Sequence, residues 1–425
     1  MLDLTLPGEA EAALEPTAEA VARWRRPSVR LTALALSLAS LGLVATASAA
    51  QGSAFAAAAG KRLVLTALGV LVFVAASQVP YQWWRRHHLA ALALSLGALA
   101  AVLVPGIGVE INHARRWINP GLPIGLQPSE LAKVGLCIWV AAYCERNATR
   151  MRSAVHGFLV PLGVVGFACL LVLAEPDFGT AVLTGAVCLA VLLVVGTRPV
   201  YVLLAAAAGM PLLRKLILEV PYRRARVLAF LNPWSDPRGS GYQLIQSKIA
   251  IGSGGLFGRG LGIGVQKAGF LPGADNDFIF SILAEELGLI GSLAVIALFV
   301  VLLWECLRIV LRSRDAFAFA LALGLSWLLG MQAAAHVAVV TGSMPTKGLS
   351  LPFISAGGSS LMASMLAAGI LVGIARSEEE PERCPVVPWQ QDVPAYERLL
   401  AGLARAAAGA TARLAGRIFA RARSW

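Results

Sequence analysis

Asp277 is the residue of this chain best suited to acid–base chemistry. It follows Pro272-Gly273-Ala274-Asp275-Asn276 and precedes the apolar residues Phe278-Ile279-Phe280. If a helix starts at Asp277, its carboxylate and that of Glu285 lie on one face about 12 Å apart, farther than the ~5 to ~9.5 Å of paired-carboxylate glycoside hydrolases. One carboxylate acting alone is therefore the better hypothesis. The alternative is that Asp277 only caps the helix.

Basic residues that could bind a phosphate group stand at two places. Arg115, Arg116 and Trp117 form either an ordinary interfacial belt of basic and aromatic side chains or part of a phosphate site. Lys133 falls one turn inside an apolar segment, where an ammonium group needs a carboxylate partner or a polar cavity. It either pairs with Glu130 at i, i+3 or joins a positive helix end in holding a phosphate.

Two further segments allow more than one interpretation. Asp177, in Glu175-Pro176-Asp177-Phe178, either starts a helix or presents a carboxylate at the outer surface. Glycines 252, 254, 255, 258, 260, 262 and 264 either form turns or line an anion site with backbone N–H groups. Arg223 and other basic residues share this loop, so an anionic lipid headgroup fits it.

The elements that must position these residues are transmembrane helices. The chain has 425 residues, 57% of them hydrophobic and 14% charged, with a mean hydropathy of +0.71, which excludes a soluble globular domain. The length of the apolar segments also excludes an outer-membrane β-barrel. We predict an all-α polytopic membrane protein with ten spans, at about 31-50, 63-80, 88-104, 129-144, 155-174, 180-196, 200-219, 278-310, 316-340 and 357-376.

The charges and cysteines narrow the class of protein further. The net charge of +12 is explained by cytoplasmic loops and lipid headgroups, so nucleic acid is not implied as a partner. The six cysteines fall in or beside apolar segments or in the polar tail, which argues against a disulfide framework and a cysteine metal site.

The positions of Lys and Arg predict the orientation. With the N-terminus inside, most short loops rich in arginine are cytoplasmic, and Lys61 with Arg62 is the exception. We expect a cytoplasmic segment at 1-30, a membrane domain at 31-376 and a cytoplasmic tail at 377-425. The outward loops are then 105-128, 341-356 and, before the eighth span, the large loop 220-277. The tail is expected to be a disordered linker, and its basic end at 413-421 is a candidate for a helix on the inner leaflet.

Six motifs resemble those of one known family. In chain order, they are Arg115-Arg116-Trp117-Ile118, Gln127 to Lys133, Pro176 to Thr180, Gly241-Tyr242-Gln243, Asp277 to Phe280, and Gly342 to Gly348 with Ser355 to Ser360. The set is similar to the signatures of the SEDS proteins, among them FtsW, RodA and SpoVE. It covers residues 31-376.

The resemblance implies a peptidoglycan glycosyltransferase of the bacterial inner membrane that polymerises lipid II outside that membrane. It also implies a class B penicillin-binding protein, a transpeptidase, and other divisome proteins as partners. Pro345-Thr346-Lys347-Gly348 is closer to FtsW than to RodA, which favours cell division over elongation. Asp277 matches the family's essential acid, and we expect these residues to bind substrate: Arg115, Arg116, Trp117, Gln127, Lys133, Asp177, Arg223, Lys347 and Ser359.

The chain departs from the family pattern near the expected site. Where the family usually has Glu-Ala-His-Thr-Asp, this chain has Gly273 to Asp277, which leaves open whether Asp275 shares the role of Asp277. His336 replaces an Asn, Ala356 a Tyr, and Glu175 a Gln.

The resemblance leads to a hypothesis for the mechanism. Asp277 takes the proton of the acceptor hydroxyl, while Lys133, Arg115, Arg116 and Arg223 hold the pyrophosphate leaving group. No metal-ligand cluster appears in the sequence, although a Mg²⁺ or Mn²⁺ ion bridging Asp277 and the pyrophosphate stays an alternative. A lipid II flippase and a scaffold are the competing functions. Charges spread through the bilayer depth would favour the flippase.

Overall fold

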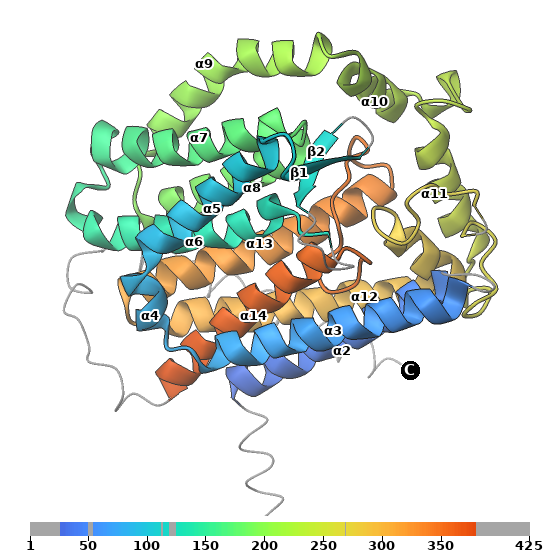
Figure 1. Ribbon diagram of the computed structural model, residues 1–425, viewed down its shortest axis with the longest axis horizontal. Coiled ribbons are helices and arrows are strands. Elements are labelled where there is room, and N and C mark those ends of the chain that lie inside the picture. Colours follow the sequence, from blue (N-terminus) through green and yellow to red (C-terminus); the bar gives the residue numbers. More distant parts are fainter. Residues whose placement is uncertain (1–25, 50–53, 112–113, 119–124, 268, 380–425) are drawn as a thin grey trace, which may run out of the picture.

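The computed structural model of the protein describes residues 26–49, 54–111, 114–118, 125–267 and 269–379. The expected N-terminal segment, apart from its last residues, and the tail beyond 379 lie outside the described residues. Nearly all of the described chain is helical (Figure 1). The α-helices are α2 (Pro27–Ala49), α3 (Ala54–Gln78), α4 (Tyr81–Arg86), α5 (His88–Leu103), α6 (Pro128–Arg146), α7 (Val160–Ala174), α8 (Phe178–Val195), α9 (Pro199–Leu218), α10 (Pro221–Leu231), α11 (Tyr242–Ser253), α12 (Ile279–Arg312), α13 (Ala316–Val340) and α14 (Gly358–Glu379).

Each of the ten predicted spans coincides with a helix, which confirms the all-α membrane fold. By length and composition, seven helical segments can cross a bilayer: those of α2, α3, α7, α8, α12, α13 and α14, with α7 extended by a π-helical turn at Val155–Leu159. Helix α5 and the first part of α9 are apolar but shorter. Helix α6 carries Glu130 and Lys133 within its apolar sequence.

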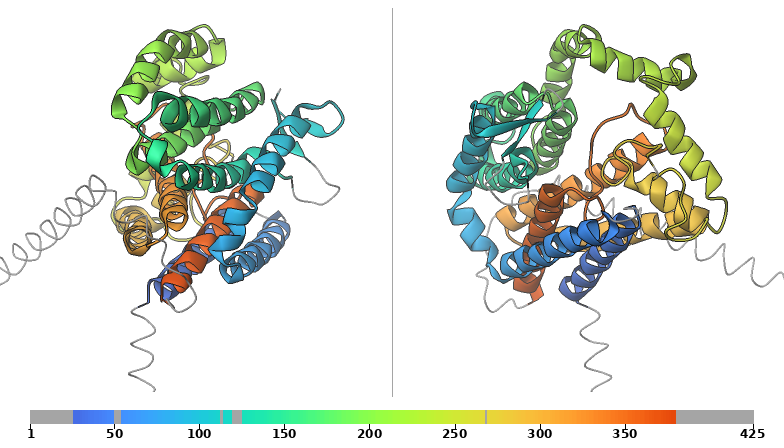
Figure 2. Two further views of the ribbon diagram at one scale, coloured as in Figure 1. Left: turned by 90° about the vertical axis from the view of Figure 1, so that its left-hand side faces the viewer. Right: turned by 45° about the vertical axis from the view of Figure 1, so that its right-hand side comes forward.

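Helices α6, α13 and α14 form the centre of the bundle. Helix α14 packs against α2, α3 and α6, while α13 packs against α6, α8 and α12 (Figures 1 and 2). Gly369 of α14 explains one close approach, because a Cβ there would lie 2.6 Å from the backbone oxygen of Phe73 in α3. Small residues permit such contacts between membrane helices.

Helix α9 lies apart from this centre. It packs mainly against α10, and both arch away from the bundle in all three views (Figures 1 and 2). Pro211 lies inside α9, and Leu203 and Leu204 on its surface are exposed.

The loops that are expected to face outward contain structure that the sequence did not indicate. An antiparallel hairpin, β1 (Gly108–Ile111) and β2 (Ala114–Ile118), occupies the first of them. The large loop contains α10, a 3-10 turn at Pro233–Ser235, and α11. The segment between α13 and α14 is non-helical from 341 to 357, and Ser359 and Ser360 lie in the first turn of α14, which begins at Gly358.

Helix α12 differs from the expectation at its start and in its middle. It begins at Ile279, so Asp277 lies in the preceding turn and not on a helix face shared with Glu285. At Gly288 the backbone leaves helical geometry, with φ 68°. The inferred spacing between Asp277 and Glu285 along one helix was therefore wrong.

The glycine-rich segment does bind anions, but they are the chain's own carboxylates. The backbone N–H groups of Val265 and Gln266 donate to Glu285 over 2.8 and 3.2 Å, and that of Gly262 donates to Glu286 over 3.2 Å. Lys267 completes the cluster with an ion pair of 2.7 Å to Glu286. These donors are occupied, so the expected headgroup site on these amides is not formed.

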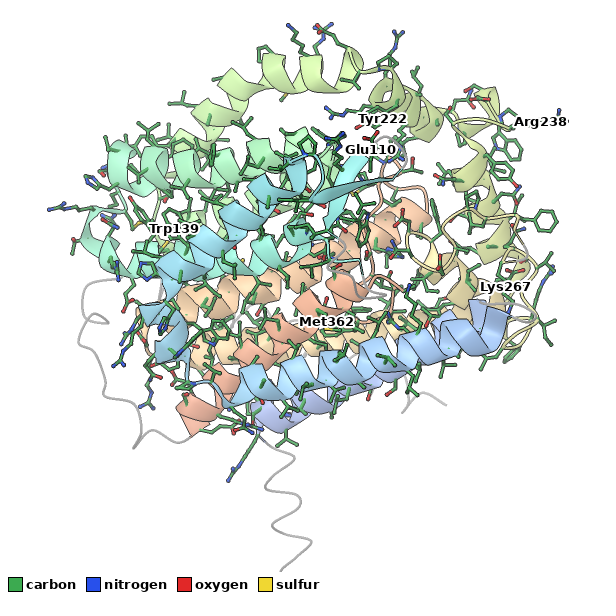
Figure 3. The ribbon with its side chains drawn as sticks, in the orientation of Figure 1. Glu110, Trp139, Tyr222, Arg238, Lys267 and Met362 are labelled. Carbon is green, nitrogen blue, oxygen red and sulfur yellow. The ribbon has the colours of Figure 1, made fainter. Side chains whose placement is uncertain are left out.

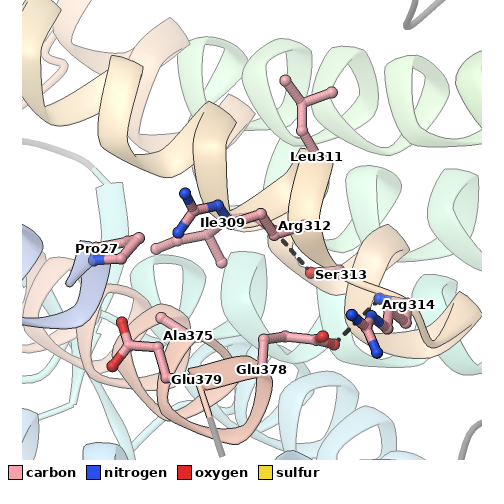
Figure 4. A pocket seen from close by; sticks show the side chains of 9 residues that line it. All are labelled: Pro27, Ile309, Leu311, Arg312, Ser313, Arg314, Ala375, Glu378 and Glu379. Atoms are coloured by element: carbon pink, nitrogen blue, oxygen red, sulfur yellow. Dashed lines mark hydrogen bonds between the residues drawn. The ribbon is translucent and has the colours of Figure 1, made fainter. Parts of the chain in front are cut away.

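A cavity of about 480 Å³ lies at the opposite end of α12 from Asp277 (Figure 4). It lies between the start of α2 and the ends of α12 and α14, and is lined by Pro27, Ile309, Leu311, Arg312, Ser313, Arg314, Ala375, Glu378 and Glu379. Because of this position, it does not belong to the site of Asp277.

Candidate active site

Asp277 sits in a turn that is tied to the non-helical segment after α13. The Asp277 and Phe278 N–H groups both donate to the Gly273 carbonyl, and Gly273 supports the turn with φ 71°. Ser355 Oγ donates to the backbone oxygen of Asn276 over 2.7 Å. These bonds fix the position of Asp277 relative to segment 341–357.

The surroundings of the Asp277 carboxyl make it a stronger base than an ordinary aspartate. The pKa of Asp277 is raised to about 6, mainly by burial; Arg226 and Arg116 act to lower it, whereas Asp275 and Asp177 act to raise it. Asn276 Nδ2 donates to Asp277 Oδ1 over 3.0 Å. Gly348 lies close to the other oxygen, since a Cβ at this glycine would lie 2.9 Å from Oδ2.

Two cationic side chains approach this region from the loops. Arg226, in α10, donates to the backbone oxygen of Thr346 over 3.3 Å and so joins α10 to segment 341–357. Lys347 lies with its Nζ 5.4 Å from the centre of the Phe178 ring, at the start of α8. Burial lowers the pKa of Lys347, and the neighbouring Asp177 opposes that change.

The turn between α7 and α8 is held by Arg116. This guanidinium donates to the backbone oxygens of Glu175 over 2.9 Å and Pro176 over 2.6 Å. Glu175 is fully buried, and neither carboxylate oxygen has a hydrogen-bond partner among the described residues. Burial and then Asp177 raise the pKa of Glu175, Arg116 acts to lower it, and the result is about 8, so the carboxyl is mostly neutral at pH 7.

Asp177, Gln127 and Ser359 form one polar network beside this turn. Asp177 caps α8, accepting from the Thr180 N–H over 3.0 Å and the Thr180 hydroxyl over 2.9 Å. Gln127 Nε2 reaches the second Asp177 oxygen at 3.4 Å, and its backbone N–H donates to Ser359 Oγ over 2.9 Å. The helix start at Asp177, one of the two alternatives raised by the sequence, is therefore present, and a contact between Asp177 and substrate stays a prediction.

Lys133 is buried inside the bundle, with 2% of its surface exposed. Its ammonium donates to Glu130 over 2.8 Å and to Gln332 Oε1 of α13 over 2.9 Å. The ion pair with Glu130, one of the two alternatives raised by the sequence, is therefore present. A contact between Lys133 and substrate stays a prediction.

Arg115, Trp117 and Arg223 lie at the edge of the region. Arg115 pairs with Glu110, labelled in Figure 3, across the hairpin at 3.2 Å, and the two side chains are 39% and 49% exposed. Trp117 lies in β2, opposite Val109. The Arg223 guanidinium carbon lies 5.3 Å from the centre of the Phe178 ring, on the same ring that Lys347 approaches.

The sequence interpretation missed two residues that the structure brings to this region. Arg226 could have been found from the basic cluster Arg223-Arg224-Ala225-Arg226. Arg62 is buried and donates to the backbone oxygens of Phe353, Ile354 and Ser355 over 2.6 to 3.0 Å. Arg62 could have been found from the sequence, because Lys61 and Arg62 are the exception to the rule that basic residues lie in the cytoplasmic loops.

Among the described residues, no group of three His, Cys, Asp or Glu side chains is placed to hold a metal ion. A divalent ion shared between Asp277 and a pyrophosphate was left open by the sequence as an alternative, and it is not tested.

The chain matches a family of proteins over most of its length. The model of the cell cycle protein family FtsW/RodA/SpoVE matches residues 28–380. The probable peptidoglycan glycosyltransferase FtsW of Trichlorobacter lovleyi is 42% identical over 315 residues, which cover 74% of this chain and 82% of that protein. The stage V sporulation protein E of Bacillus subtilis is 36% identical over 358 residues, covering 82% and 97%.

Solved structures show the same fold. A chain of a peptidoglycan synthase complex that coordinates polymerization and crosslinking is 31% identical, with a TM-score of 0.68, covering 82% of this chain and 97% of that one. The rod shape determining protein RodA of Thermus thermophilus is 27% identical, with a TM-score of 0.61, covering 82% and 96%. The family match spans nearly all the described residues, and so this chain belongs to the FtsW/RodA/SpoVE family of cell cycle proteins.

Proposed function

We propose that this protein is a peptidoglycan glycosyltransferase that polymerises lipid II into glycan strands during septal cell-wall synthesis. The names of its FtsW relatives support this activity and the role in division. The observation that carries the proposal is the partly buried Asp277, whose pKa is raised to about 6 and which lies near the cations Arg226 and Arg116.

The geometry suits a general base better than a general acid. A carboxylate with a pKa near 6 is mostly ionised at neutral pH, yet accepts a proton more readily than an ordinary aspartate. Asp277 takes the proton of the acceptor hydroxyl, whose oxygen forms the new bond to the anomeric carbon. The bond from that carbon to the pyrophosphate oxygen breaks, and the pyrophosphate leaves with the electron pair, so the configuration inverts.

The pyrophosphate leaving group requires positive charge and no proton. Arg116, Arg226 and Lys347 supply that charge from three separate elements: the hairpin, α10 and the segment after α13. Their positions are set by contacts with backbone oxygens and with the Phe178 ring. Cations held in place before the reaction stabilise the charge that develops on the leaving group.

The proposal includes a location and partners. The protein crosses the bacterial cytoplasmic membrane with both termini in the cytoplasm, and Asp277 faces outward. It works with a class B penicillin-binding protein and other divisome proteins. The similarity to a chain of a complex that coordinates polymerization and crosslinking supports a transpeptidase partner.

Asp275 provides a matched control for testing the role of Asp277. Its side chain is exposed and lies in the same turn, two residues away. Purified Asp277→Asn and Asp275→Asn proteins are compared with wild type, each with the partner transpeptidase and labelled lipid II, by electrophoresis of the glycan chains. We expect Asp277→Asn to lose about 10²-fold or more in rate, and Asp275→Asn to retain most of it.

Two results would reject the assignment. One is a folded Asp277→Asn protein that polymerises at the wild-type rate. The other is a wild-type protein that makes no glycan but moves lipid II between the leaflets of vesicles, which would identify a flippase.

A further inference from the structure

A group of apolar side chains projects from the glycine-rich segment at the same end of the bundle as Asp277. They are Leu256, Phe257, Leu261 and Ile263, exposed by 60%, 81%, 53% and 67%, and are called the apolar loop patch below. Phe257 is the most exposed large hydrophobic residue of the described chain. Apolar surface of this extent is unfavourable in water, so a binding partner is expected.

Backbone hydrogen bonds hold the patch rigidly against α12. At the helix break, the Leu289 and Ile290 N–H groups donate to the Gly255 and Leu256 oxygens over 2.9 and 3.2 Å. In return, the Arg259 N–H donates to the Glu285 oxygen over 3.0 Å. The loop therefore supplies acceptors for helix N–H groups that lose their partners at Gly288. These hydrogen bonds fix the position of the loop along the axis of α12.

Glycine is required where the two backbones meet. Gly258 and Gly288 have φ of 82° and 68°, and a Cβ on either would overlap the backbone of the other segment. The loop is thus packed into the break as closely as the backbone allows.

The length of α12 places this break at the membrane boundary. Its 34 residues extend about 51 Å, whereas the hydrocarbon core is about 30 Å thick and needs about 20 residues. If the hydrocarbon core begins at Arg312, the last residue of α12, about 20 residues of helix reach back to Leu293. Leu293 lies about one turn from Ile290. The apolar loop patch is therefore level with the edge of the hydrocarbon region.

Helix α2 gives the same level independently. Its 23 residues extend about 35 Å, close to the thickness of the core, and Ser48 lies at its outer end. Ser48 Oγ accepts from the Gly262 N–H over 3.0 Å, and Lys267, labelled in Figure 3, donates to the Ser48 backbone oxygen over 2.6 Å.

The patch also continues a surface that faces lipid. Leu289, Ile290 and Leu293 of α12 are 50 to 55% exposed, and they follow directly from the hydrogen bonds to the loop. We propose that the apolar loop patch is an interfacial anchor that inserts between the phospholipids of the leaflet nearest Asp277. Its effect is to hold the turn that leads to Asp277 at a set height above the bilayer.

The depth of single side chains tests this anchor. The full-length protein carries one nitroxide label in place of Phe257, in nanodiscs of phosphatidylethanolamine and phosphatidylglycerol. The wild-type protein, labelled in the same way, measures the signal from nitroxide attached to native cysteines, and this signal is subtracted. Leu293→Cys is the control for lipid and Arg238→Cys, on the exposed large loop (Figure 3), the control for water. Collisions with oxygen report lipid, and those with a water-soluble nickel chelate report solvent.

We expect the label at 257 to resemble that at 293, with several-fold lower nickel accessibility and higher oxygen accessibility than the label at 238. Nickel accessibility at 257 equal to that at 238 would overturn the proposal. So would protection at 257 that appears only when the partner transpeptidase is added, because the patch would then be a protein-docking surface.

Discussion

At the scale of single residues, the proposed chemistry depends on the difference between two neighbouring carboxylates. Asp275 is exposed, whereas Asp277 is partly buried and its pKa is raised to about 6. The family resemblance left open which of the two acts, and burial favours Asp277. Lys133 shows the converse case, because a cation predicted to meet substrate is enclosed by Glu130 and Gln332.

The pH dependence of glycan synthesis follows from the pKa of Asp277. The proposed base works only as carboxylate, so kcat/KM should fall about tenfold per pH unit as pH falls below about 6. Arg226 lowers this pKa, and Arg226→Gln should therefore move the midpoint to higher pH. The control variant, Asp275→Asn, should still lose activity at acid pH. The midpoint of that loss should move to slightly lower pH, because Asp275 raises the pKa of Asp277. A wild-type rate that stays constant down to about pH 5 would contradict the assignment.

At the scale of elements, the site depends on non-helical segments that are held by buried side chains. Segment 341–357 contains Leu351, Phe353 and Ile354 in the core, and its backbone is not helical. Arg62 of α3 supplies donors to three of its carbonyl groups. Irregular backbone at this depth requires such partners, because lipid offers none.

Removing those donors should destabilise the protein. Arg62→Met leaves buried carbonyl groups unsatisfied, at a cost of about 3 kcal/mol or more. The neighbouring Lys61 is exposed, so Lys61→Met should leave the melting temperature unchanged. Thermal unfolding in detergent, followed by fluorescence, measures both variants. Equal melting temperatures for the two would show that Arg62 does not support the segment.

At the scale of the whole molecule, the two ends of the bundle differ in kind. Asp277, Arg116 and Lys347 gather at one end, and the apolar loop patch is joined to α12 near the same end. The other end carries the cavity between α2, α12 and α14, with Arg312 and Arg314 at its wall (Figure 4). This asymmetry agrees with an enzyme that acts at one membrane face.

The orientation can be measured with reporter fusions. Alkaline phosphatase joined after Arg238 should be active, because that loop is expected to face outward. The same enzyme joined after Arg150, between α6 and α7, or after Glu379 should be inactive, because basic loops remain in the cytoplasm. A reversed pattern would place Asp277 in the cytoplasm and contradict synthesis at the outer face.

Hydropathy alone predicted the positions and order of the apolar helices: each of the ten predicted segments coincides with a helix, and seven are long and apolar enough to cross a bilayer. In a bilayer, each apolar segment must satisfy its own backbone hydrogen bonds, so an apolar run of sufficient length becomes a helix whatever its neighbours. The motifs determined the family, and the helix start at Asp177 also followed from local sequence. These properties depend on residues close together in the chain.

The tertiary structure alone decided which polar groups meet. Lys133 reaches Gln332, Arg62 reaches Ser355, and the glycine-rich segment encloses Glu285 and Glu286. Such pairs join segments far apart in sequence, or a loop to a helix break, and spacing along the chain carries no information about them. The packing of the helices sets these distances, and burial then sets the pKa of Asp277.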